Sequence, residues 1–360
     1  MQPASYASTL VPFSRSSSGG TRGGYAGNMH AASPSTTVSV ALCTYNGERF
    51  VRSQLESILG QSRPVDEVVI GDDGSSDRTV EIIRDTVDAW GAQDTVRIAF
   101  TDRAGGVVPN FERTLRACKG SLIALSDQDD VWHPDRILRA VERFEERPSL
   151  DLLSSDAVII DGVGEPTGAS LWGHLYVSAD ELDRIAKGRG FEVLIRRNVV
   201  TGATAMLRRE FLTAALPLPS SWIHDEWLAI LAAARGGFDV SPERLIDYRV
   251  HGGNQIGVAE PTLRRRVAQV LAPRGDRLAR LAVRADRLVG RLETHGAPAE
   301  VVELARLKQE FERRRSLYPT ARLRRLGPVV RNAKGGSYPR LSSQGNLDVI
   351  RDLLQPASAV

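Results

Sequence analysis

The chain has 360 residues, of which 42% are hydrophobic and 25% charged, an ordinary composition for a soluble globular protein of about two domains. Its two cysteines, Cys43 and Cys118, exclude a disulfide framework and a structural zinc site, and their apolar surroundings predict buried thiols in a reducing compartment. No apolar run reaches the length of about 18 residues that a transmembrane helix needs, so none is expected.

Charge is unevenly placed along the chain. Residues 1–36 are rich in Ser, Gly and Ala and lack the basic start and apolar core of a secretory signal, so we expect a disordered tail. Residues 261–360 hold 21 basic and 9 acidic residues, a balance of +12, whereas the whole chain has only +3. A basic C-terminal region on an acidic body indicates contact with an anionic surface.

From Val38 onward, short apolar runs alternate with segments of helical spacing. Strands are predicted at 38–43, 66–71, 95–100 and 121–126, and helices between them at 48–61, 75–90 and 111–118. Continuous apolar strands separated by helices predict right-handed crossovers and a mostly parallel sheet covered on both faces. Ligands of such sheets bind beyond the carboxyl ends of the strands.

The remainder of the chain predicts a second half of the same domain and a helical extension. Further strands are expected within 150–160, within 198–210 and near 245–250, and a helix around 225–235. Apolar residues at three/four spacing then predict two amphipathic helices, joined in a hairpin by the sequence THGAPA. The basic tail that follows is less regular. The predicted organisation is therefore a tail at 1–36, a domain at 37–260 and a basic helical region at 261–360.

A cluster of acids follows the fourth predicted strand. Asp127, Asp129 and Asp130 occupy three of four consecutive positions, and a role in starting the next helix explains only one of them. Three neighbouring carboxylates repel one another unless a cation neutralises them. Carboxylate oxygens suit Mg²⁺ or Mn²⁺, which keep positions open for water and phosphate. The cluster therefore favours a divalent metal site.

Polar residues also follow the first two strands. In DDGSSD (72–77), a turn and a helix cap account for the second half of the motif, while Asp73 stands at the sheet edge, where it could accept hydrogens from a nucleobase. In TYNGE (44–48), Tyr45 offers an aromatic face beside it. Each motif alone leaves a plain loop and a ligand site equally open.

Taken together, SVALCTYNGERFVRSQLESILGQ, DEVVIGDDGSSDRT and ALSDQDDVWHPDRI resemble the family 2 glycosyltransferases over about residues 38–255. The resemblance implies the GT-A fold, a Rossmann-like α/β fold with a mostly parallel mixed sheet flanked by helices, here followed by the basic helical extension. It also implies an Asp-x-Asp motif that holds a cation bridging the phosphates of a nucleotide-sugar. Asp127 would then face the ribose or sugar and Asp129 the metal, with Asp130 able to share the metal.

The same resemblance assigns the nucleotide site to Thr44, Tyr45 and Asp73, with Glu48 nearby. Cys43 departs from it, because proline or threonine is often found at this position. NVVTGATAM would supply a glycine loop in which Gly202 lets the backbone approach the donor sugar.

SWIHDEWLAI matches the HD-W pattern of rhamnosyltransferase-like members, which places the catalytic base at Asp225, with Glu226 as the alternative base. A helix start with favourable acids is the competing interpretation. The apolar flanks of the motif favour the base, because a partly dry pocket raises the pKa of a carboxylate toward working pH.

YRVHGGNQIG resembles a further segment of the same subgroup, in which His251 would contact the metal or diphosphate and Arg249 a phosphate; a structural histidine is the alternative.

These assignments predict an inverting enzyme that uses Mg²⁺ or Mn²⁺ to move rhamnose from dTDP-rhamnose to a cell-surface polysaccharide or a lipid-linked glycan, although UDP- and GDP-sugars fit similar motifs. One carboxylate base without a nucleophile implies single displacement. The expected location is the cytoplasm, with peripheral contact to the inner face of the plasma membrane through residues 318–340. The helical hairpin would pack on the catalytic domain or on a second subunit, and no nucleic acid partner is expected.

Two other classes of protein compete with this assignment. A non-catalytic nucleotide-sugar-binding or scaffold relative would have lost its acids, whereas DQDD and HDEW are complete. A nucleotidyltransferase would carry a glycine-rich phosphate loop after the first strand, whereas TYNGER has a single glycine.

Overall fold

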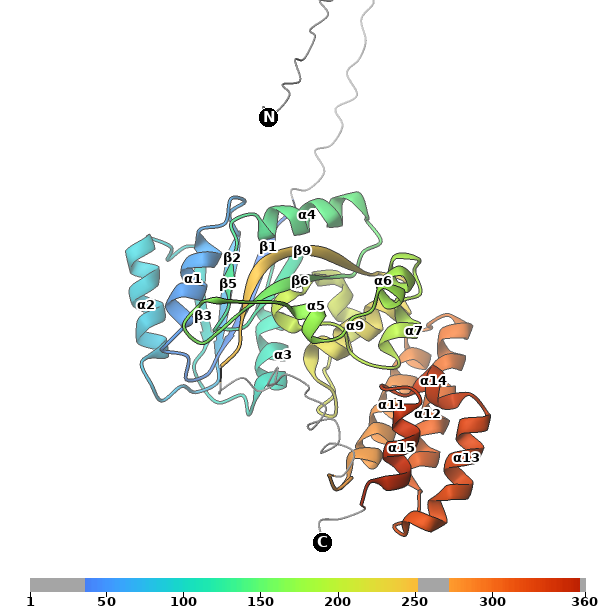
Figure 1. Ribbon diagram of the computed structural model, residues 1–360. Coiled ribbons are helices and arrows are strands. Elements are labelled where there is room, and N and C mark those ends of the chain that lie inside the picture. Colours follow the sequence, from blue (N-terminus) through green and yellow to red (C-terminus); the bar gives the residue numbers. More distant parts are fainter. Residues whose placement is uncertain (1–35, 252–271, 357–360) are drawn as a thin grey trace, which may run out of the picture. The chain divides into compact units, whose positions relative to one another are not determined.

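The computed structural model describes residues 36–251 and 272–356, so the predicted tail at 1–36 and the domain boundary at 260 fall almost entirely outside the described residues. The first half of the fold is a parallel sheet in the order β3-β2-β1-β4 (Figure 1). Its strands and crossover helices are β1 (Val38–Thr44), α1 (Val51–Leu59), β2 (Glu67–Asp72), α2 (Thr79–Trp90), β3 (Val96–Phe100), α3 (Val107–Ala117) and β4 (Leu122–Ser126).

The second half extends the same sheet as β4-β8-β6-β9-β5, with β7 on β6, and mixes parallel and antiparallel pairs. Its strands are β5 (Val131–Trp132), β6 (Leu152–Ile160), β7 (Pro166–Ser170), β8 (Met206–Arg208) and β9 (Phe238–Arg249). Its helices are α4 (Arg136–Glu146), α5 (Leu171–His174), α6 (Ala179–Ala186), α7 (Gly190–Leu194), η1 (Gly202–Thr204), η2 (Arg209–Phe211), α8 (Leu212–Ala215) and α9 (His224–Ala234). The predicted mostly parallel mixed sheet is confirmed.

Two hydrophobic cores cover the two faces of the sheet, as the alternation of side chains along a buried strand requires. Val40 and Leu42 of β1 belong to the core that α1, α2 and α4 close, and Ala41 between them belongs to the core of α3, α7 and α9. Because all three residues are fully buried, β1 reads as a continuous apolar run. This sandwiched position fixes the loop that follows β1 at the carboxyl edge of the sheet.

Two predicted helices begin later than the sequence pattern indicated. The helix expected from residue 48 begins at Val51, because the carbonyl of Gly47 first accepts hydrogens from Phe50 and Val51 in a turn. The helix expected from residue 75 begins at Thr79, because Asp77 binds the backbone N–H and the hydroxyl of Thr79. In both cases the polar residues before the helix belong to the loops at the sheet edge.

The C-terminal region is helical throughout its described part. The predicted hairpin is formed by α11 (Arg277–Thr294) and α12 (Ala299–Ser316). The tail that the sequence pattern left irregular also folds into η3 (Arg322–Arg325), α13 (Leu326–Lys334), α14 (Ser337–Leu341) and α15 (Leu347–Leu354). None of the helices in the described ranges is both long and apolar enough to cross a membrane.

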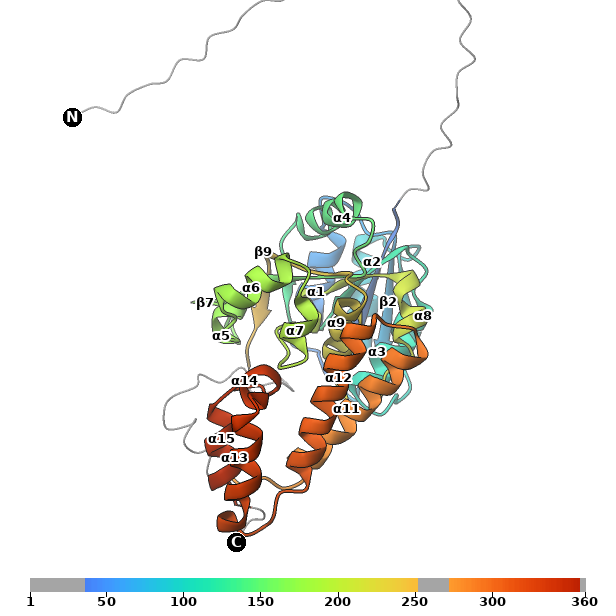
Figure 2. The ribbon, with the colours of Figure 1, turned by 90° about the vertical axis from the view of Figure 1, so that its right-hand side faces the viewer.

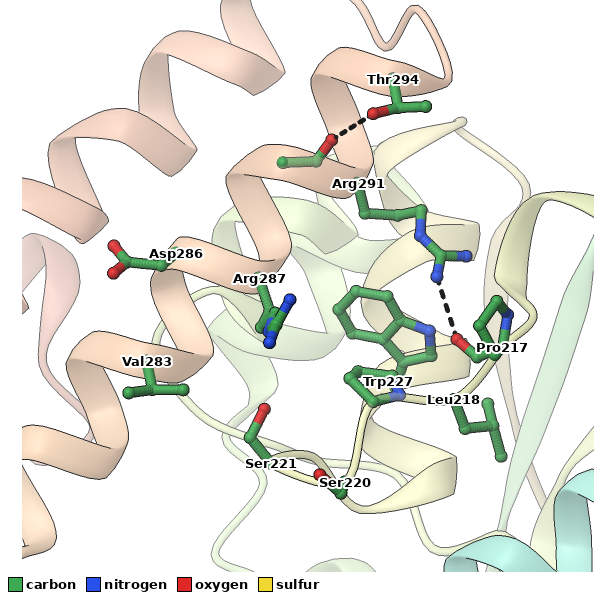
Figure 3. A pocket seen from close by; sticks show the side chains of 12 residues that line it. Pro217, Leu218, Ser220, Ser221, Trp227, Val283, Asp286, Arg287, Arg291 and Thr294 are labelled. Carbon is green, nitrogen blue, oxygen red and sulfur yellow. Dashed lines mark hydrogen bonds between the residues drawn. The ribbon is translucent and has the colours of Figure 1, made fainter.

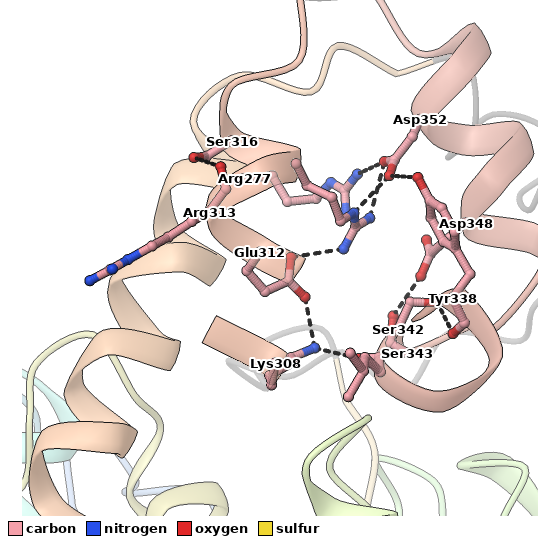
Figure 4. Close-up of polar contacts among 12 residues, drawn as sticks. Arg277, Lys308, Glu312, Arg313, Ser316, Tyr338, Ser342, Ser343, Asp348 and Asp352 are labelled. Atoms are coloured by element: carbon pink, nitrogen blue, oxygen red, sulfur yellow. Dashed lines mark hydrogen bonds and ion pairs between the residues drawn. The ribbon is translucent and has the colours of Figure 1, made fainter. Parts of the chain in front are cut away.

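A buried ionic network joins these C-terminal helices (Figure 4). Arg315 of α12 is 1% exposed and donates to Asp352 of α15 and to Glu312, and the Tyr338 hydroxyl of α14 donates to the same Asp352 carboxylate. Lys308 forms an ion pair with Glu312 at 2.7 Å. Because an uncompensated charge in this interior would be costly, the network specifies how α12, α14 and α15 pack.

Candidate active site

The loops that follow β1, β2 and β4, together with the end of β9, meet at one edge of the sheet. The acid loop, residues 127–130, leaves β4 and returns as β5, which pairs with Ile246 and Asp247 of β9. The loop is also tied to the one after β1, because the Gln128 side chain accepts from the Tyr45 N–H at 2.8 Å and donates to the Tyr45 carbonyl at 3.0 Å. The structure thus brings the predicted cation and nucleobase loops together.

Within the acid loop, Asp129 faces His251. The Asp129 carboxylate lies 2.8 Å from His251 Nε2, and the imidazole lies against the ring of Phe50 with centroids 4.9 Å apart. Arg249 donates from Nε to the Asp129 carbonyl at 2.8 Å and from Nη1 to the Asp161 carbonyl at 3.2 Å. Asp129, Arg249 and His251 therefore form one unit, in which Arg249 holds backbone carbonyls.

Asp130 occupies a different environment from its neighbour. It is 1% exposed, its Oδ1 accepts the backbone N–H of Arg249 at 3.0 Å, and its Oδ2 has no hydrogen-bond partner among the described residues. Burial, together with the charges of Asp129 and Asp127, raises the pKa of Asp130 well above its ordinary value. Arg136, which is stacked 3.5 Å from the ring centroid of Trp132, opposes that shift.

The carboxylates after β2 mainly bind their own loops. Asp72 accepts from the hydroxyls of Thr44 and Ser75, which fixes Thr44 below the edge of the sheet. Asp73 accepts backbone hydrogens from Ala104, from Gly105 at 3.0 Å and from Gly106 at 2.8 Å. Asp73 was predicted to meet a nucleobase, and the structure adds that it shapes the loop before α3.

The aromatic face predicted for a base is accessible. Tyr45 is 48% exposed, while its backbone is held by the acid loop. Glu48 accepts the backbone N–H of Arg78 at 3.1 Å, and its own N–H donates to Asp77. Glu48 therefore links the loop after β1 to the segment that begins α2.

The segment of the predicted base lies at the start of α9 and packs on η1. Asp225 is 3% exposed, and its Oδ2 accepts the Gly202 N–H at 2.9 Å. His224 stacks on Phe111 with centroids 3.9 Å apart, and neither of its ring nitrogens has a partner among the described residues. A Cβ on Gly202 would lie 2.6 Å from His224 Nε2, so this glycine is needed for packing against His224.

Burial makes Asp225 and Asp127 weaker acids than an ordinary aspartate. It raises the pKa of Asp225 to about 7, with Glu226 as the next cause, while backbone hydrogen bonds lower it. Burial also raises the pKa of Asp127 to about 7, with the charges of Asp129 and Asp225 adding to it. The contribution of Asp225 to the pKa of Asp127 means that the start of α9 lies within electrostatic reach of the acid loop.

Glu226, next to Asp225 in the chain, contacts the C-terminal helical region. Its Oε1 forms an ion pair with Arg284 of α11 at 2.5 Å, and the Arg284 guanidinium lies 4.1 Å from the ring centroid of Trp222. The Trp222 indole N–H in turn donates to the Arg284 carbonyl at 3.1 Å. Hence α11 fixes both sides of the segment that carries Asp225.

A pocket of about 530 Å³ lies between residues 217–221, which lead into α9, and the adjacent side of α11 (Figure 3). Arg291 spans it, donating to the Pro217 carbonyl at 2.9 Å with its guanidinium 5.3 Å from the ring centroid of Trp227. Ser221 Oγ is buried there without a partner among the described residues.

Sequence reasoning missed four residues of this site. Gln128 counted only as the middle position of the Asp-x-Asp motif, Arg136 counted only as part of a helix start, and Arg284 lies far away in the chain. Burial raises the pKa of Tyr248 of β9, and the charges of the acid loop and of Asp225 add to that shift. Gln128, Arg136 and Tyr248 stand inside the quoted motifs, whereas Arg284 carried no local signal.

The donor set suits a hard divalent cation in kind. Asp129 is partly exposed and already paired with His251, and carboxylate oxygen with imidazole nitrogen is a donor set that Mn²⁺ and Mg²⁺ sites use. The described residues do not, however, contain a preformed cluster of three or more His, Cys, Asp or Glu ligands arranged around one point. Such a cation would therefore need ligands from outside this set, and substrate phosphates would supply oxygens of that kind.

Residues 39–214 match the family described as Glycosyl transferase family 2, and this match ends before Asp225 and before α11. An uncharacterized glycosyltransferase of Nostoc sp. is 28% identical over 226 residues, 60% of this chain and 66% of the relative. The chain thus spans just under two thirds of that relative's length.

Two named relatives and one solved structure add detail. The putative teichuronic acid biosynthesis glycosyltransferase TuaG of Bacillus subtilis is 22% identical over 218 residues, 59% of this chain and 79% of the relative. The dTDP-rhamnosyl transferase RfbG of Shigella flexneri is 31% identical over 104 residues, 28% of this chain and 36% of the relative. S. aureus TarS 1–349 in complex with UDP-GlcNAc superposes with a TM-score of 0.50 at 16% identity, covering 88% of this chain and 90% of that one, which indicates a common fold.

Proposed function

This chain belongs to glycosyl transferase family 2 and is a glycosyltransferase, and from that premise we propose that it transfers a sugar from a nucleotide-sugar to a hydroxyl of a cell-wall polysaccharide, with inversion at the anomeric carbon. The observation that carries the proposal is the meeting of the loops after β1 and β4 with the end of β9 at one edge of the sheet, where Gln128 binds Tyr45 and Asp129 faces His251. A donor held at this edge would present its anomeric carbon to an acceptor held beside it.

Asp225 is the proposed base. Its pKa near 7 makes it a competent proton acceptor at neutral pH, and the Gly202 N–H fixes one of its oxygens. Glu226, engaged by Arg284, is less suited to that role. In the reaction, the acceptor oxygen forms the new bond to the anomeric carbon, the bond to the diphosphate breaks, and the hydroxyl proton passes to Asp225.

We infer inversion because, among the described residues, the other carboxylates near Asp225 are assigned to the donor, the cation or the loop and none to the role of nucleophile. Double displacement needs a nucleophile that attacks the anomeric carbon before the acceptor does. In this proposal Asp127 binds the ribose or the sugar, so a single attack from the side of Asp225 is the simplest route.

We assign a divalent cation, Mg²⁺ or Mn²⁺, to Asp129 and His251. When bound, such an ion supplies Lewis-acid stabilisation for the charge on the leaving diphosphate. Asp130, buried and bound to the Arg249 N–H, holds the acid loop on β9 in this assignment. Arg249, whose guanidinium holds two carbonyls, keeps the loop in place from the other side.

The proposed nucleotide site uses Tyr45 as a stacking face and Thr44, Glu48 and Asp73 as the groups that shape the surrounding loops. The proposed donor is dTDP-rhamnose, which is supported by the HD-W resemblance and by the partial similarity to RfbG. The acceptor class is supported by the similarity to TuaG, whose name assigns it to teichuronic acid biosynthesis.

The test uses the full chain with a panel of nucleotide-sugars, with and without Mn²⁺, read out by thermal shift and by release of the nucleotide diphosphate. Asp225→Asn should abolish transfer while keeping the Mn²⁺-dependent shift, because it removes the base and leaves the donor site. Asp129→Ala should lose both. Asp85→Asn, on the exposed side of α2, is the matched control and should change neither.

Near-normal turnover in both site variants would refute the assignment of the base and of the cation ligand. A shift with a UDP-sugar in place of dTDP-rhamnose would refute the donor alone.

A further inference from the structure

The last helices of the described chain expose their apolar residues. Of the thirteen large hydrophobic side chains that are exposed among the described residues, seven lie between positions 317 and 354. Leu323 is 92% exposed and Leu317 81%. The other six are scattered over the rest of the described chain, as single exposed hydrophobics commonly are. This concentration of exposed apolar side chains in the C-terminal helices therefore indicates a surface that contacts a partner.

The exposed residues form rows along two neighbouring helices. Leu326 and Val330 are one turn apart on α13, with Leu323 of η3 continuing the row, and Leu347, Ile350 and Leu354 follow helical spacing on α15. The two helices lie side by side (Figures 1 and 2). Together these six residues define what we call the outer surface.

The polarity of α15 is inverted relative to an ordinary surface helix. Its fully buried residues are Asp348, which accepts from Ser343 and Gln344, and Asp352, which binds Arg315. Val349 and Leu353 pack partly against the core, whereas Leu347, Ile350 and Leu354 face outward. A helix that packs on a protein core normally buries its apolar side. Here the fully buried positions of α15 are acids and three large apolar side chains stay outside, so the outer surface is left for another apolar medium.

The charged residues beside the outer surface indicate which apolar medium it contacts. Arg322, Arg324, Arg331 and Lys334 are all exposed beside the outer surface, and none of them is ion-paired to another described residue. Residues 317–356 contain only two acids, Asp348 and Asp352, and both are buried. The accessible surface of this segment therefore carries positive charge without exposed negative charge.

We propose that the outer surface docks on an anionic lipid bilayer, with its apolar rows in the interfacial layer and its arginines and lysine on the headgroups. Amphipathic helices with basic residues at the polar margin bind membranes in this way. A second copy of the chain would bring the same positive charges to the contact, so self-association is disfavoured by repulsion. The proposal goes beyond the sugar chemistry and does not depend on the identity of the donor.

In this proposal the C-terminal helices bind the membrane and the sheet domain carries the active site. The network of Arg315, Glu312 and Asp352 holds α15 against α12, and α12 pairs with α11, whose Arg284 binds Glu226 beside the proposed base. The docking surface and the active site are thus connected through packed helices. A membrane-bound acceptor would meet the enzyme already anchored to the same bilayer.

The test is sedimentation of the purified full chain with vesicles of phosphatidylcholine alone or mixed with phosphatidylglycerol. We expect binding to the mixed vesicles only, with loss at high salt, because charges near a surface are screened beyond a Debye length of about 10 Å. Arg322→Gln combined with Arg324→Gln should weaken binding about 25-fold, since each basic residue contributes about fivefold.

Apolar variants separate insertion from plain electrostatic attraction. Leu323→Ser combined with Leu326→Ser should weaken binding at least about tenfold while leaving the unfolding temperature unchanged, because both leucines are already exposed. Val163→Ser, which removes a 77% exposed valine between β6 and β7, is the matched control and should bind like the parent chain.

Equal binding to neutral and anionic vesicles, or no binding to either, would overturn the proposal. So would an oligomer, measured by light scattering without lipid, that the Leu323→Ser/Leu326→Ser variant abolishes, because the outer surface would then be a protein interface. These readouts involve no sugar transfer, so they remain informative if the proposed donor or base is wrong.

Discussion

Replacing Arg284 by glutamine should alter the pH dependence of transfer, although Arg284 makes no contact with the proposed base. Arg284 pairs with Glu226 at 2.5 Å, and both side chains are largely buried, at 23% and 15% exposure. Glu226 is the main charge that raises the pKa of Asp225. Without Arg284, the Glu226 charge acts on Asp225 undiminished, so the pKa of Asp225 should rise further.

The magnitude follows from the acidity of Asp225. Its pKa is about 7 in the intact site. An unshielded neighbouring carboxylate adds about one unit, which reduces the deprotonated fraction about eightfold at pH near 6.5 and hardly changes it near 9.5. The acidic limb of kcat/KM should therefore move to higher pH by about one unit, while the plateau at high pH stays close to that of the parent chain.

Other charged and titratable groups near Asp225 set the background of this experiment. Asp127 of the acid loop and Tyr248 of β9 both lie within electrostatic reach of it. His224, on the same helix, stays neutral because burial lowers its pKa to about 3. None of these changes in the Arg284 variant, so the shift of the limb reports on Glu226.

The assay is nucleotide release measured from pH 5.5 to 10, with a double-variant cycle. Glu226→Gln should move the limb to lower pH, and adding Arg284→Gln to it should cause little further shift, because the charge that Arg284 shields is already gone. Arg287→Gln, an exposed neighbour on α11, is the control. The reasoning is refuted if Arg284→Gln lowers kcat/KM equally at all pH values, which would indicate a purely structural role.

Three further outcomes follow from the packing and charges of the described residues. Gly202→Ala should cost about 1–3 kcal/mol of unfolding free energy in urea and lower kcat, because its Cβ overpacks the site, whereas Gly290→Ala, with open space around it in α11, should be neutral or stabilising. Tyr45→Ala should raise the donor KM about tenfold by removing a stacking face, with thermal stability unchanged because the ring is exposed. Asp352→Asn should lower the free energy of unfolding by about 3–5 kcal/mol, since it leaves buried cations uncompensated, whereas Asp286→Asn, in an exposed pair, should cost less than about 1 kcal/mol.

Much of the fold was predictable because local pattern and tertiary role agree. β1, β2 and β4 are buried on both faces, so each is a continuous apolar run, and the polar loops after them had to gather at one edge. The boundaries of α1 and α2 were less accurate. Residues such as Asp77 occur both at helix starts and in loops. Which of the two forms here depends on contacts with the neighbouring loop, such as the Glu48 N–H that donates to Asp77.

The sequence predicted that the acids gather at the sheet edge, but it did not predict the partner of each acid. The sequence placed Asp129 and Asp130 side by side, whereas their division into a residue that faces His251 and a buried residue depends on the pairing of β5 with β9. Similarly, no local signal connects Glu226 with Arg284, because two segments far apart in the chain meet only after the helical region has packed.

α15 lies within the helical region predicted at 261–360, but no separate helix was predicted over its residues. Amphipathic patterns are recognised by an apolar side that faces the core, whereas the fully buried residues of α15 are Asp348 and Asp352. Asp352 obtains its partner, Arg315, only when α12 packs against it.

The side-chain amide of Gln128 has a consequence for substitution at position 47. It accepts from the Tyr45 N–H and donates to the Tyr45 carbonyl, and a Cβ at Gly47 would lie 2.2 Å from its Oε1. A larger residue at position 47 would therefore displace the Gln128 amide, the flexible end of its side chain, and break both of its hydrogen bonds to Tyr45. The aromatic face would then lose its tie to the acid loop although every acid is unchanged.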